Sequence, residues 1–416
     1  METRTKNVSL DDLQEIVGAE HAREATPDDA VDGVEPAFVA EPGSIEETSE
    51  LLSLAGEEGL AVAPRGGGTK DSLGNPPREL DLILSTARMN EIVEHVPGDQ
   101  VVRVQAGMRL QDLQERLAGS DQMLGIDPPE EGATIGGVVA ANFSGPRRHR
   151  YGTIRDLIIG ITVVLSDGTV AKAGGKVVKN VAGYDLSKLF TGSLGTLGVI
   201  AECNFRLHPR PEAGRTVAVE LESTLAAGEA AQAVLHAQVV PSVVELQWGE
   251  DAGCLSVLIE GIEPSVEAQA ETASYLLRGF GELTDRPFAS LTPPEGEVAI
   301  KISAPPAELT DVLDSTLGAC SRRGVTPSIT GHAGIGVTYA ALSGGGEEAQ
   351  VQIVEELREI WSRRGGSVVL REAPPAFKKR VEVWGPLGSR LELTRRVKQK
   401  FDPRGILNPG RFAGGI

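Results

Sequence analysis

Three consecutive glycines follow a short apolar run in the segment Arg65-Gly66-Gly67-Gly68-Thr69. Glycine lacks a Cβ atom, so such a backbone can turn successive N–H groups toward an anion. Thr69 adds a hydroxyl donor, and Arg65 and Lys70 place positive charge on either side of the loop. A pyrophosphate would suit this loop, although a bare glycine-rich turn explains the three glycines equally well.

Two other phosphate-binding motifs are absent from the sequence. It contains no G-x-x-x-x-G-K-[ST] pattern, which excludes a P-loop. It also contains no G-x-G-x-x-G pattern, so a Rossmann dinucleotide site is not supported.

Two further segments are rich in glycine and other small residues. The first runs from Gly132 to Gly145 (GATIGGVVAANFSG), and the second covers residues 184–200 (YDLSKLFTGSLGTLGVI). Small side chains let a flat ring lie against the backbone, whose N–H groups can bond the polar edge of a flavin. The alternatives are a tight contact between a helix and a sheet for the first segment, and a helix-to-strand turn for the second.

A histidine and several basic residues could act on a substrate. His332, in the run Gly331-His332-Ala333-Gly334, could serve as a general base, although a histidine near a turn more often has a structural role. A single histidine does not make a metal site, so we expect no metal. The fork of an arginine suits a substrate carboxylate. The candidates for that role are Arg371, Lys378, Arg148 and Arg150.

Composition limits the classes of function that remain. The 416 residues predict at least two domains, and a net charge of −19 disfavours nucleic acid and anionic membrane surfaces. The three cysteines are far apart, which argues against disulfides or an iron–sulfur cluster held by this chain alone. No signal peptide or transmembrane stretch is recognisable. We therefore expect a cytoplasmic protein that reaches a membrane, if at all, only through its partners.

The pattern of apolar residues predicts the elements that position these motifs. Ser44 and Glu47 form a capping box for a helix that ends at Gly59, and a strand over residues 60–64 then leads into the glycine loop. The Asp167-Gly168 pair predicts a hairpin with a two-residue loop. Further strands are expected at 81–86, 101–107, 160–171 and 198–207, and further helices at 10–17, 110–119, 134–142 and 347–364.

Five segments, taken in order, resemble the vanillyl-alcohol-oxidase family of flavoproteins, also called the PCMH type: RGGGT, GATIGGVVAANFSG, YGTIRD, KNVAGYDLSKLFTGSLGTLGVI and FDPRGILNPGRF. Within that family, the segments 127–129, 144–148 and 179–185 are most similar to E-type subunits of glycolate oxidase. The resemblance implies an α+β fold. An acidic extension (1–35) would precede a two-subdomain FAD-binding domain (36–211). An α+β cap or substrate domain with an antiparallel sheet (212–400) and a tail returning to the flavin (401–416) would follow.

The resemblance also implies a site for FAD. The pyrophosphate would lie on the glycine loop, and the segments after Gly132 and Asn142 would border the flavin. Some relatives attach FAD through a histidine in a GGHS-like loop, which here reads Gly67-Gly68-Thr69-Lys70, so non-covalent FAD is expected. The expected cofactor-binding residues are Pro64, Arg65, Gly66, Gly67, Gly68, Thr69, Lys70, Pro128, Gly132, Ala133, Thr134, Gly136, Gly137, Asn142, Ser144, Gly145, Tyr151, Gly152, Asp156, Gly198, Val199, Ile200 and Asn408. The catalytic candidates are His332 and Arg371.

The function implied by the resemblance is oxidation of a small 2-hydroxyacid such as glycolate or lactate. Electrons would pass to an iron–sulfur subunit, in a complex that also contains a D-type flavoprotein. D-type relatives carry a G-H-x-G-D-G-N-x-H run, of which this chain keeps only His332. An alternative is therefore an FAD-binding relay or assembly subunit whose D-type partner oxidises the substrate. A flavin-free structural role is a third alternative, which the intact RGGGT disfavours.

Overall fold

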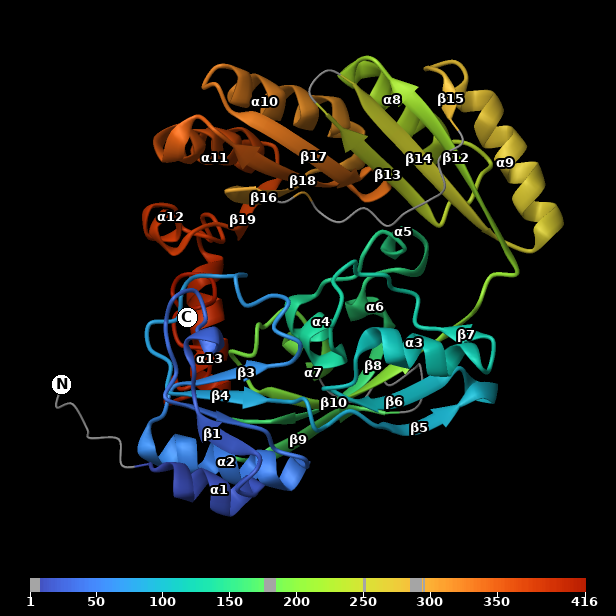
Figure 1. Cartoon of the computed structure of the whole chain (residues 1–416). Helices are drawn as coiled ribbons and strands as arrows, with labels where there is room; N and C mark the ends of the chain where they lie inside the picture. The colour runs from blue at the N-terminus through green and yellow to red at the C-terminus, as the bar shows by residue number, and fades with distance from the viewer. Residues whose placement is uncertain (1–7, 176–184, 250–251, 285–293, 295) are drawn as a thin grey trace.

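The computed structural model describes residues 8–175, 185–249, 252–284, 294 and 296–416. Figure 1 shows two bodies, one above the other. The lower body contains the described residues of the ranges 8–209 and 384–416, and the upper body contains those of the range 213–372. Part of the expected motif at 179–185 lies outside the described residues.

The lower body begins with a four-stranded sheet that ends at the glycine loop. Its strand order is β1-β2-β4-β3, with β2, β4 and β3 parallel and β1 antiparallel to β2. The Ser44 hydroxyl caps α2 by accepting from the N–H of Glu47, but the Glu47 carboxylate accepts from Gly43 rather than from Ser44. Gly59 ends α2 in the left-handed conformation. The elements are α1 (Leu10–Val17), β1 (Ala22–Glu24), β2 (Phe38–Ala40), α2 (Ile45–Glu58), β3 (Val62–Arg65) and β4 (Leu82–Ser85).

Residues 8–35, expected to belong to an acidic extension, are an integral part of this sheet. Its strand β1 pairs with β2, and Leu13, Val17 and Ala22 are buried in the same core as α2 and β4. The expected helix at 10–17 is present as α1, and its acidic residues occupy exposed positions between the buried ones.

A five-stranded antiparallel sheet completes the lower body, in the order β5-β6-β10-β8-β9. The predicted hairpin joins β8 to β9, but its loop is longer than two residues. Leu165 bonds to Thr169 and Gly168 has φ of 83°, so three residues form the turn. The strands are β5 (Ile92–Val96), β6 (Val101–Gln105), β8 (Ile158–Val164), β9 (Val170–Gly174) and β10 (Val199–Arg206). The helices are α3 (Leu110–Ala118), α4 (Ile135–Ala141), α5 (Arg148–Tyr151), α6 (Ile154–Leu157) and α7 (Leu186–Phe190).

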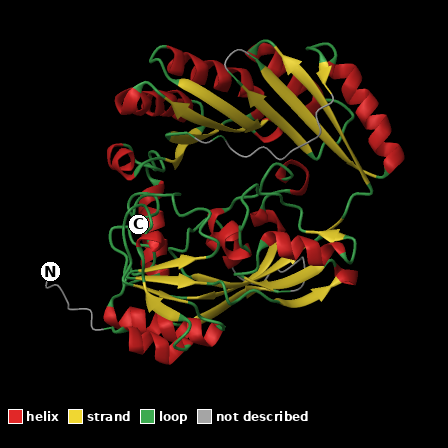
Figure 2. Cartoon of the chain, viewed as in Figure 1, coloured by secondary structure: helices red, strands yellow, loops and turns green. Residues whose placement is uncertain are grey.

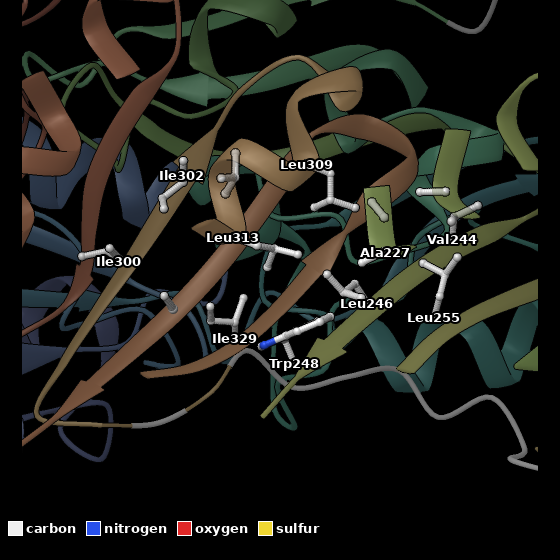
Figure 3. Close-up of a cluster of buried hydrophobic side chains, with 14 of the residues drawn as sticks. Ala227, Val244, Leu246, Trp248, Leu255, Ile300, Ile302, Leu309, Leu313 and Ile329 are labelled. Atoms are coloured by element: carbon white, nitrogen blue, oxygen red, sulfur yellow. The ribbon is translucent and has the colours of Figure 1, made fainter. Parts of the chain in front are cut away.

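The upper body is one antiparallel sheet with its long helices on a single face (Figures 1 and 2). In Figure 3, Leu246 and Ile329 of the sheet lie against Leu309 and Leu313 of α10. Each such buried side chain stabilises the fold by about 1.5–3 kcal/mol. The strands are β12 (Ala213–Leu221), β13 (Val243–Trp248), β14 (Gly253–Gly261), β15 (Leu283–Thr284), β16 (Val298–Ser303), β17 (Thr326–His332), β18 (Val337–Ser343) and β19 (Ser367–Glu372). The helices are α8 (Thr224–Leu235), α9 (Glu263–Leu277), α10 (Leu309–Ser321) and α11 (Gly346–Arg363).

The opposite face of this sheet turns toward the lower body (Figure 1). Side chains alternate along a strand, so Ile329 points into the core while Thr330 and His332 point to the other face. Residues opposite one another on neighbouring strands share a face, which adds Glu245 beside His332 and Tyr339 beside Thr330. The sheet therefore presents a row of polar side chains to the lower body.

The chain returns to the lower body before residue 401, earlier than expected. Helix α12 (Pro375–Arg380) lies between the bodies, and α13 (Arg390–Phe401) packs on the lower one. Lys398 of α13 donates to the carbonyl of Thr196 at 2.8 Å, and Leu407 then forms a parallel bridge with Val62 on β3. The remaining short elements are β7 (Gln122–Met123), β11 (His208–Pro209) and four 3-10 turns, η1 (Pro27–Asp29), η2 (Pro97–Asp99), η3 (Pro306–Glu308) and η4 (Ala333–Ile335). Among the described residues, no helix is long and apolar enough to cross a membrane.

Candidate cofactor and substrate site

A cleft in the lower body brings three of the sequence motifs together. It lies between the glycine loop, one face of α4 and the start of β10. That face of α4 carries only small residues, so a flat group could approach the helix backbone. The lining includes the expected residues Pro64 to Lys70, Gly136, Gly137, Gly198, Val199, Ile200 and Asn408, together with Asp71, Ala140, Ala141, Leu194, Gly195 and Arg411.

The glycines of the loop are required by packing beneath it. A Cβ atom on Gly66 would lie 2.0 Å from Thr134 Oγ1, and one on Gly67 would lie 1.9 Å from the carbonyl oxygen of Gly132. Gly68 has φ of +71°, which favours glycine. The expected residues Gly132 and Thr134 therefore support the loop, and neither belongs to the lining of the cleft.

The charged residues of the loop already have partners. Arg65 Nε donates to Asp71 Oδ2 at 2.7 Å, and the ammonium of Lys70 pairs with Glu130. Burial lowers the pKa of Lys70, although Glu130 opposes this effect. Among the described residues, the N–H groups of Gly66 to Thr69 donate to no other backbone group. Backbone N–H groups, rather than the two cations, are thus the donors that this loop can offer to an anion.

Several buried polar atoms at the cleft lack a hydrogen-bond partner among the described residues. They include Oδ1 of Asn408 and Nη1 of Arg411, both in the lining. Oδ1 of Asn142 is a third such atom, and this residue follows the lining residue Ala141 in the chain without lining the cleft itself. Asn408 is held by its other side-chain atom, since Nδ2 donates to the carbonyl of Leu194 at 2.7 Å. Unpaired buried polar atoms are costly, so a polar ligand is expected to satisfy them. The donor set and the small-residue face fit a nucleotide that carries a flat ring.

Other expected cofactor residues are not in this cleft. Ser144 Oγ accepts from the N–H of Ile154 at 2.8 Å, and Asp156 caps α6 by accepting from Thr153. Tyr151 packs on His208 with ring centroids 4.9 Å apart. These side chains shape the turn around α5 and α6. The residues that the structure leaves outside the cleft are Pro128, Gly132, Ala133, Thr134, Asn142, Ser144, Gly145, Tyr151, Gly152 and Asp156.

A series of contacts connects the cleft to the polar face of the upper sheet. Lys70 in the cleft pairs with Glu130, which lies 3.6 Å from Nη2 of Arg371. The Arg371 guanidinium is 5.8 Å from the ring of Tyr339, and that ring is 5.6 Å from His332. The two bodies therefore meet in one polar cluster, defined here as Lys70, Glu130, Arg148, Glu245, Lys301, His332, Tyr339 and Arg371.

His332 in the polar cluster is oriented by Glu245. Its Nδ1 lies 2.5 Å from Glu245 Oε1, and both side chains are buried. Burial raises the pKa of Glu245, whereas the neighbouring His332 lowers it. Burial also raises the pKa of the Tyr339 hydroxyl to about 12. The histidine thus has one nitrogen engaged by a carboxylate, the arrangement that fixes the orientation of an imidazole.

The cluster also carries excess positive charge. Nε and Nη1 of Arg371 are buried without a hydrogen-bond partner among the described residues. Burial, with the repulsion of Arg148 added, lowers the pKa of Lys301 to about 8. Sequence reasoning missed Lys301 and Glu245. The available signal was a charged residue within each of the apolar strands β16 and β13, on the face opposite the core.

Two of the expected carboxylate ligands are placed elsewhere. Lys378 is buried against Asp32, and Arg150 donates to the backbone oxygen of Glu260 at 2.6 Å. Arg371 and Arg148 remain as candidates, because both belong to the polar cluster.

Comparison with known proteins assigns FAD-related families to two parts of the chain. Residues 36–174 match the FAD binding domain family, and residues 382–412 match the C-terminal domain of FAD linked oxidases. The second match coincides with the return of the chain to the lower body.

Whole-length relatives agree with these matches. Glycolate oxidase subunit GlcE of Escherichia coli is 30% identical over 375 residues, which cover 87% of this chain and 95% of that protein. Glycolate oxidase subunit GlcD of Bacillus subtilis is 26% identical, with 91% of this chain and 89% of that protein covered. The structure of p-cresol methylhydroxylase has a TM-score of 0.77 at 16% identity, covering 97% of this chain and 95% of that one. The predicted α+β, PCMH-type fold is confirmed.

Proposed function

Because this chain belongs to the PCMH-type family of FAD-linked oxidoreductases, we propose that it binds FAD non-covalently in the cleft and oxidises a small 2-hydroxyacid such as glycolate or lactate. The observation that carries this proposal is the unbroken series of contacts from Lys70 in the cleft to the Glu245–His332 pair. It connects a cofactor cleft to a group that can accept a proton.

The residues proposed to hold FAD are those of the cleft. The N–H groups of Gly66 to Thr69 would bind the pyrophosphate, and the small face of α4 would lie against the ring. Asn408 and Arg411 would use their unpaired atoms. Bound there, FAD supplies a two-electron acceptor. No histidine is present in the glycine loop, which supports a non-covalent site.

The polar cluster would hold and deprotonate the substrate. Arg371, whose guanidinium has two nitrogens without a hydrogen-bond partner in the described part of the chain, would bind the carboxylate, with Lys301 and Arg148 adding positive charge. His332 would accept the hydroxyl proton at Nε2, because Nδ1 is engaged by Glu245. The buried Glu245 carboxylate would then stabilise the imidazolium that forms.

The second candidate is a relay or assembly subunit. It is favoured by the single histidine in the 331–338 segment, where D-type relatives have two, and by the absence of a potential metal-binding group among the described residues. In this version the chain would bind FAD while a D-type flavoprotein oxidises the acid, and an iron–sulfur subunit would accept the electrons. Similarity to both GlcE and GlcD supports a complex of this type.

An anaerobic spectrum of the purified full chain separates the candidates. Flavin absorbance that glycolate or D-lactate bleaches within one turnover supports oxidation by this chain. Flavin that is bleached only after a D-type partner is added supports the relay. A colourless protein that takes up no added FAD would contradict both candidates.

A further inference from the structure

Lys378 contacts the turn that follows the glycine loop, from outside the cleft. It lies on α12, which connects the two bodies, and its side chain is fully buried at 0% exposure. Its ammonium donates to Asp32 Oδ2 at 2.7 Å and to the carbonyl oxygen of Ser72. One cation on the connecting helix therefore joins the amino-terminal segment to the turn that follows the glycine loop.

Arg411 holds the carbonyl groups on both sides of Ser72. Its Nη2 donates to the oxygen of Asp71 at 2.9 Å and to that of Leu73 at 2.5 Å. Three consecutive carbonyls just after the loop, in residues 71–73, are thus bonded by two cations from parts of the chain far away in the sequence. This turn is tied to the glycine loop, because the N–H groups of Asp71 and Leu73 donate to the carbonyl oxygens of Gly68 and Lys70 at 3.1 and 3.0 Å.

The burial of the Lys378 contacts makes them strong constraints. The side chain of Asp32 is only 6% exposed, and the residue has φ of +50°, a backbone conformation uncommon outside glycine. A buried ammonium requires partners, and removing one member of a buried pair is strongly destabilising. Burial lowers the pKa of Lys378, and the bond to Asp32 opposes this shift. The loop, the amino-terminal segment and α12 are therefore held as one unit.

We propose that Lys378 is a positioning residue for FAD: through Ser72 and Asp32 it sets the shape of the glycine loop, so that FAD is retained only while α12 is docked on the lower body. The proposal rests on the proposed function, because it presumes that the cleft binds FAD. It gives Lys378 a role different from that of substrate ligand, which its burial away from the polar cluster excludes.

A set of full-chain variants separates positioning from simple structural support. Lys378→Met removes both contacts but leaves the Asp32 charge buried. The double variant Lys378→Met with Asp32→Asn removes that charge as well, while the carbonyl of Ser72 stays without its ammonium donor. Arg380→Met is the matched control, since Arg380 is on the same helix but pairs on the surface with Glu347 and Glu348.

The measurements are the melting temperature of the FAD-free protein and the dissociation constant of FAD, from quenching of its fluorescence. We expect Lys378→Met to weaken FAD binding by at least about tenfold and to lower the melting temperature. In the double variant the melting temperature should recover toward the wild-type value, whereas FAD binding should stay weak. Arg380→Met should change neither quantity.

Two results would overturn the inference. One is wild-type FAD affinity in the double variant, and the other is equal weakening in Arg380→Met. If the wild-type chain itself binds no FAD, the proposed function is wrong. This outcome differs from failure of the inference about Lys378, because the loss of FAD binding is then not caused by any substitution.

Discussion

The imidazole of His332 and the carboxylate of Glu245 lie on neighbouring strands of the upper sheet, with Nδ1 and Oε1 2.5 Å apart. Both side chains are buried on the face that turns toward the lower body. A carboxylate in this position selects the tautomer with a proton on Nδ1 and leaves Nε2 available as a base. Substitutions in this pair therefore test whether this chain oxidises its substrate or only relays electrons.

Replacing Glu245 by glutamine should slow oxidation without loss of FAD. The amide is nearly isosteric but does not stabilise an imidazolium, so we expect kcat/KM to fall by about 10–100-fold. The check is anaerobic flavin reduction by glycolate and D-lactate, with flavin content measured in parallel. An unchanged rate of flavin reduction in Glu245→Gln would mean that the Glu245–His332 pair does not take part in the proton transfer.

Binding of an acidic substrate should weaken as the pH rises through about 8. The pKa of Lys301 is lowered to about 8, so its positive charge is lost from the polar cluster in that range. We expect KM for the hydroxyacid to rise between about pH 7 and pH 9, with kcat less affected. In Lys301→Met this dependence should disappear, and KM should be high at every pH.

The lowered pKa of Lys301 also predicts how the stability of the protein depends on pH. Lys301 ionises with a lower pKa in the folded state than in the unfolded chain, where 10.5 is its ordinary value. Between about pH 8 and 10.5 the unfolded state binds more protons, so the Lys301 contribution to the free energy of unfolding rises with pH. Below about pH 8 the cost of burying the charge is fully present. Denaturant unfolding of wild type and Lys301→Met across this range is the measurement, and equal slopes against pH would contradict the assignment.

Gly67→Ala should destabilise the protein even when FAD is absent. The added Cβ would lie 1.9 Å from the carbonyl of Gly132, so the loop or the turn beneath it must move. We expect a loss of about 1–3 kcal/mol in the free energy of unfolding of the FAD-free protein. Gly98→Ala is the control, since a Cβ added to Gly98 would have no atom within 4 Å and the φ of this residue is not positive. Equal melting temperatures of the two FAD-free variants would refute the packing argument.

The ion pair between Arg147 and Glu260 should contribute to docking of the two bodies. Arg147 Nη2 lies 2.7 Å from Glu260 Oε1, and Glu260 is buried. Arg147→Met leaves that carboxylate without its partner, so we expect a loss of about 3–5 kcal/mol. Adding Glu260→Gln should recover most of it. The check is denaturant unfolding, and a double variant no more stable than the single one would show that the charge is not the cause.

Much of the lower body could be predicted from local pattern. The helix after Ser44, the strand before Arg65 and the small residues after Gly132 have short-range signals: a cap, an apolar run and a run of glycines. The elements that carry these signals are adjacent in space, so the loop and the face of α4 lie in one cleft.

The polar cluster could not be predicted in the same way. Glu245 and His332 meet only because β13 pairs with β17, and no local signal specifies a pairing between strands so far apart. Lys378 illustrates the opposite error. Its charge suggested a ligand for a carboxylate, but the docking of α12 buries it against Asp32.

The bridge between Val62 and Leu407 has a consequence for how the protein is made. Strand β3, which leads into the glycine loop, has its outer edge paired with Leu407, which follows the whole upper body in the chain. During synthesis the intervening sheet of the upper body can close on itself first, since its pairings all lie within residues 213–372. The lower sheet gains the segment at Leu407 only after the whole upper sheet has been synthesised, so acquisition of the cofactor is expected to follow folding of the upper body.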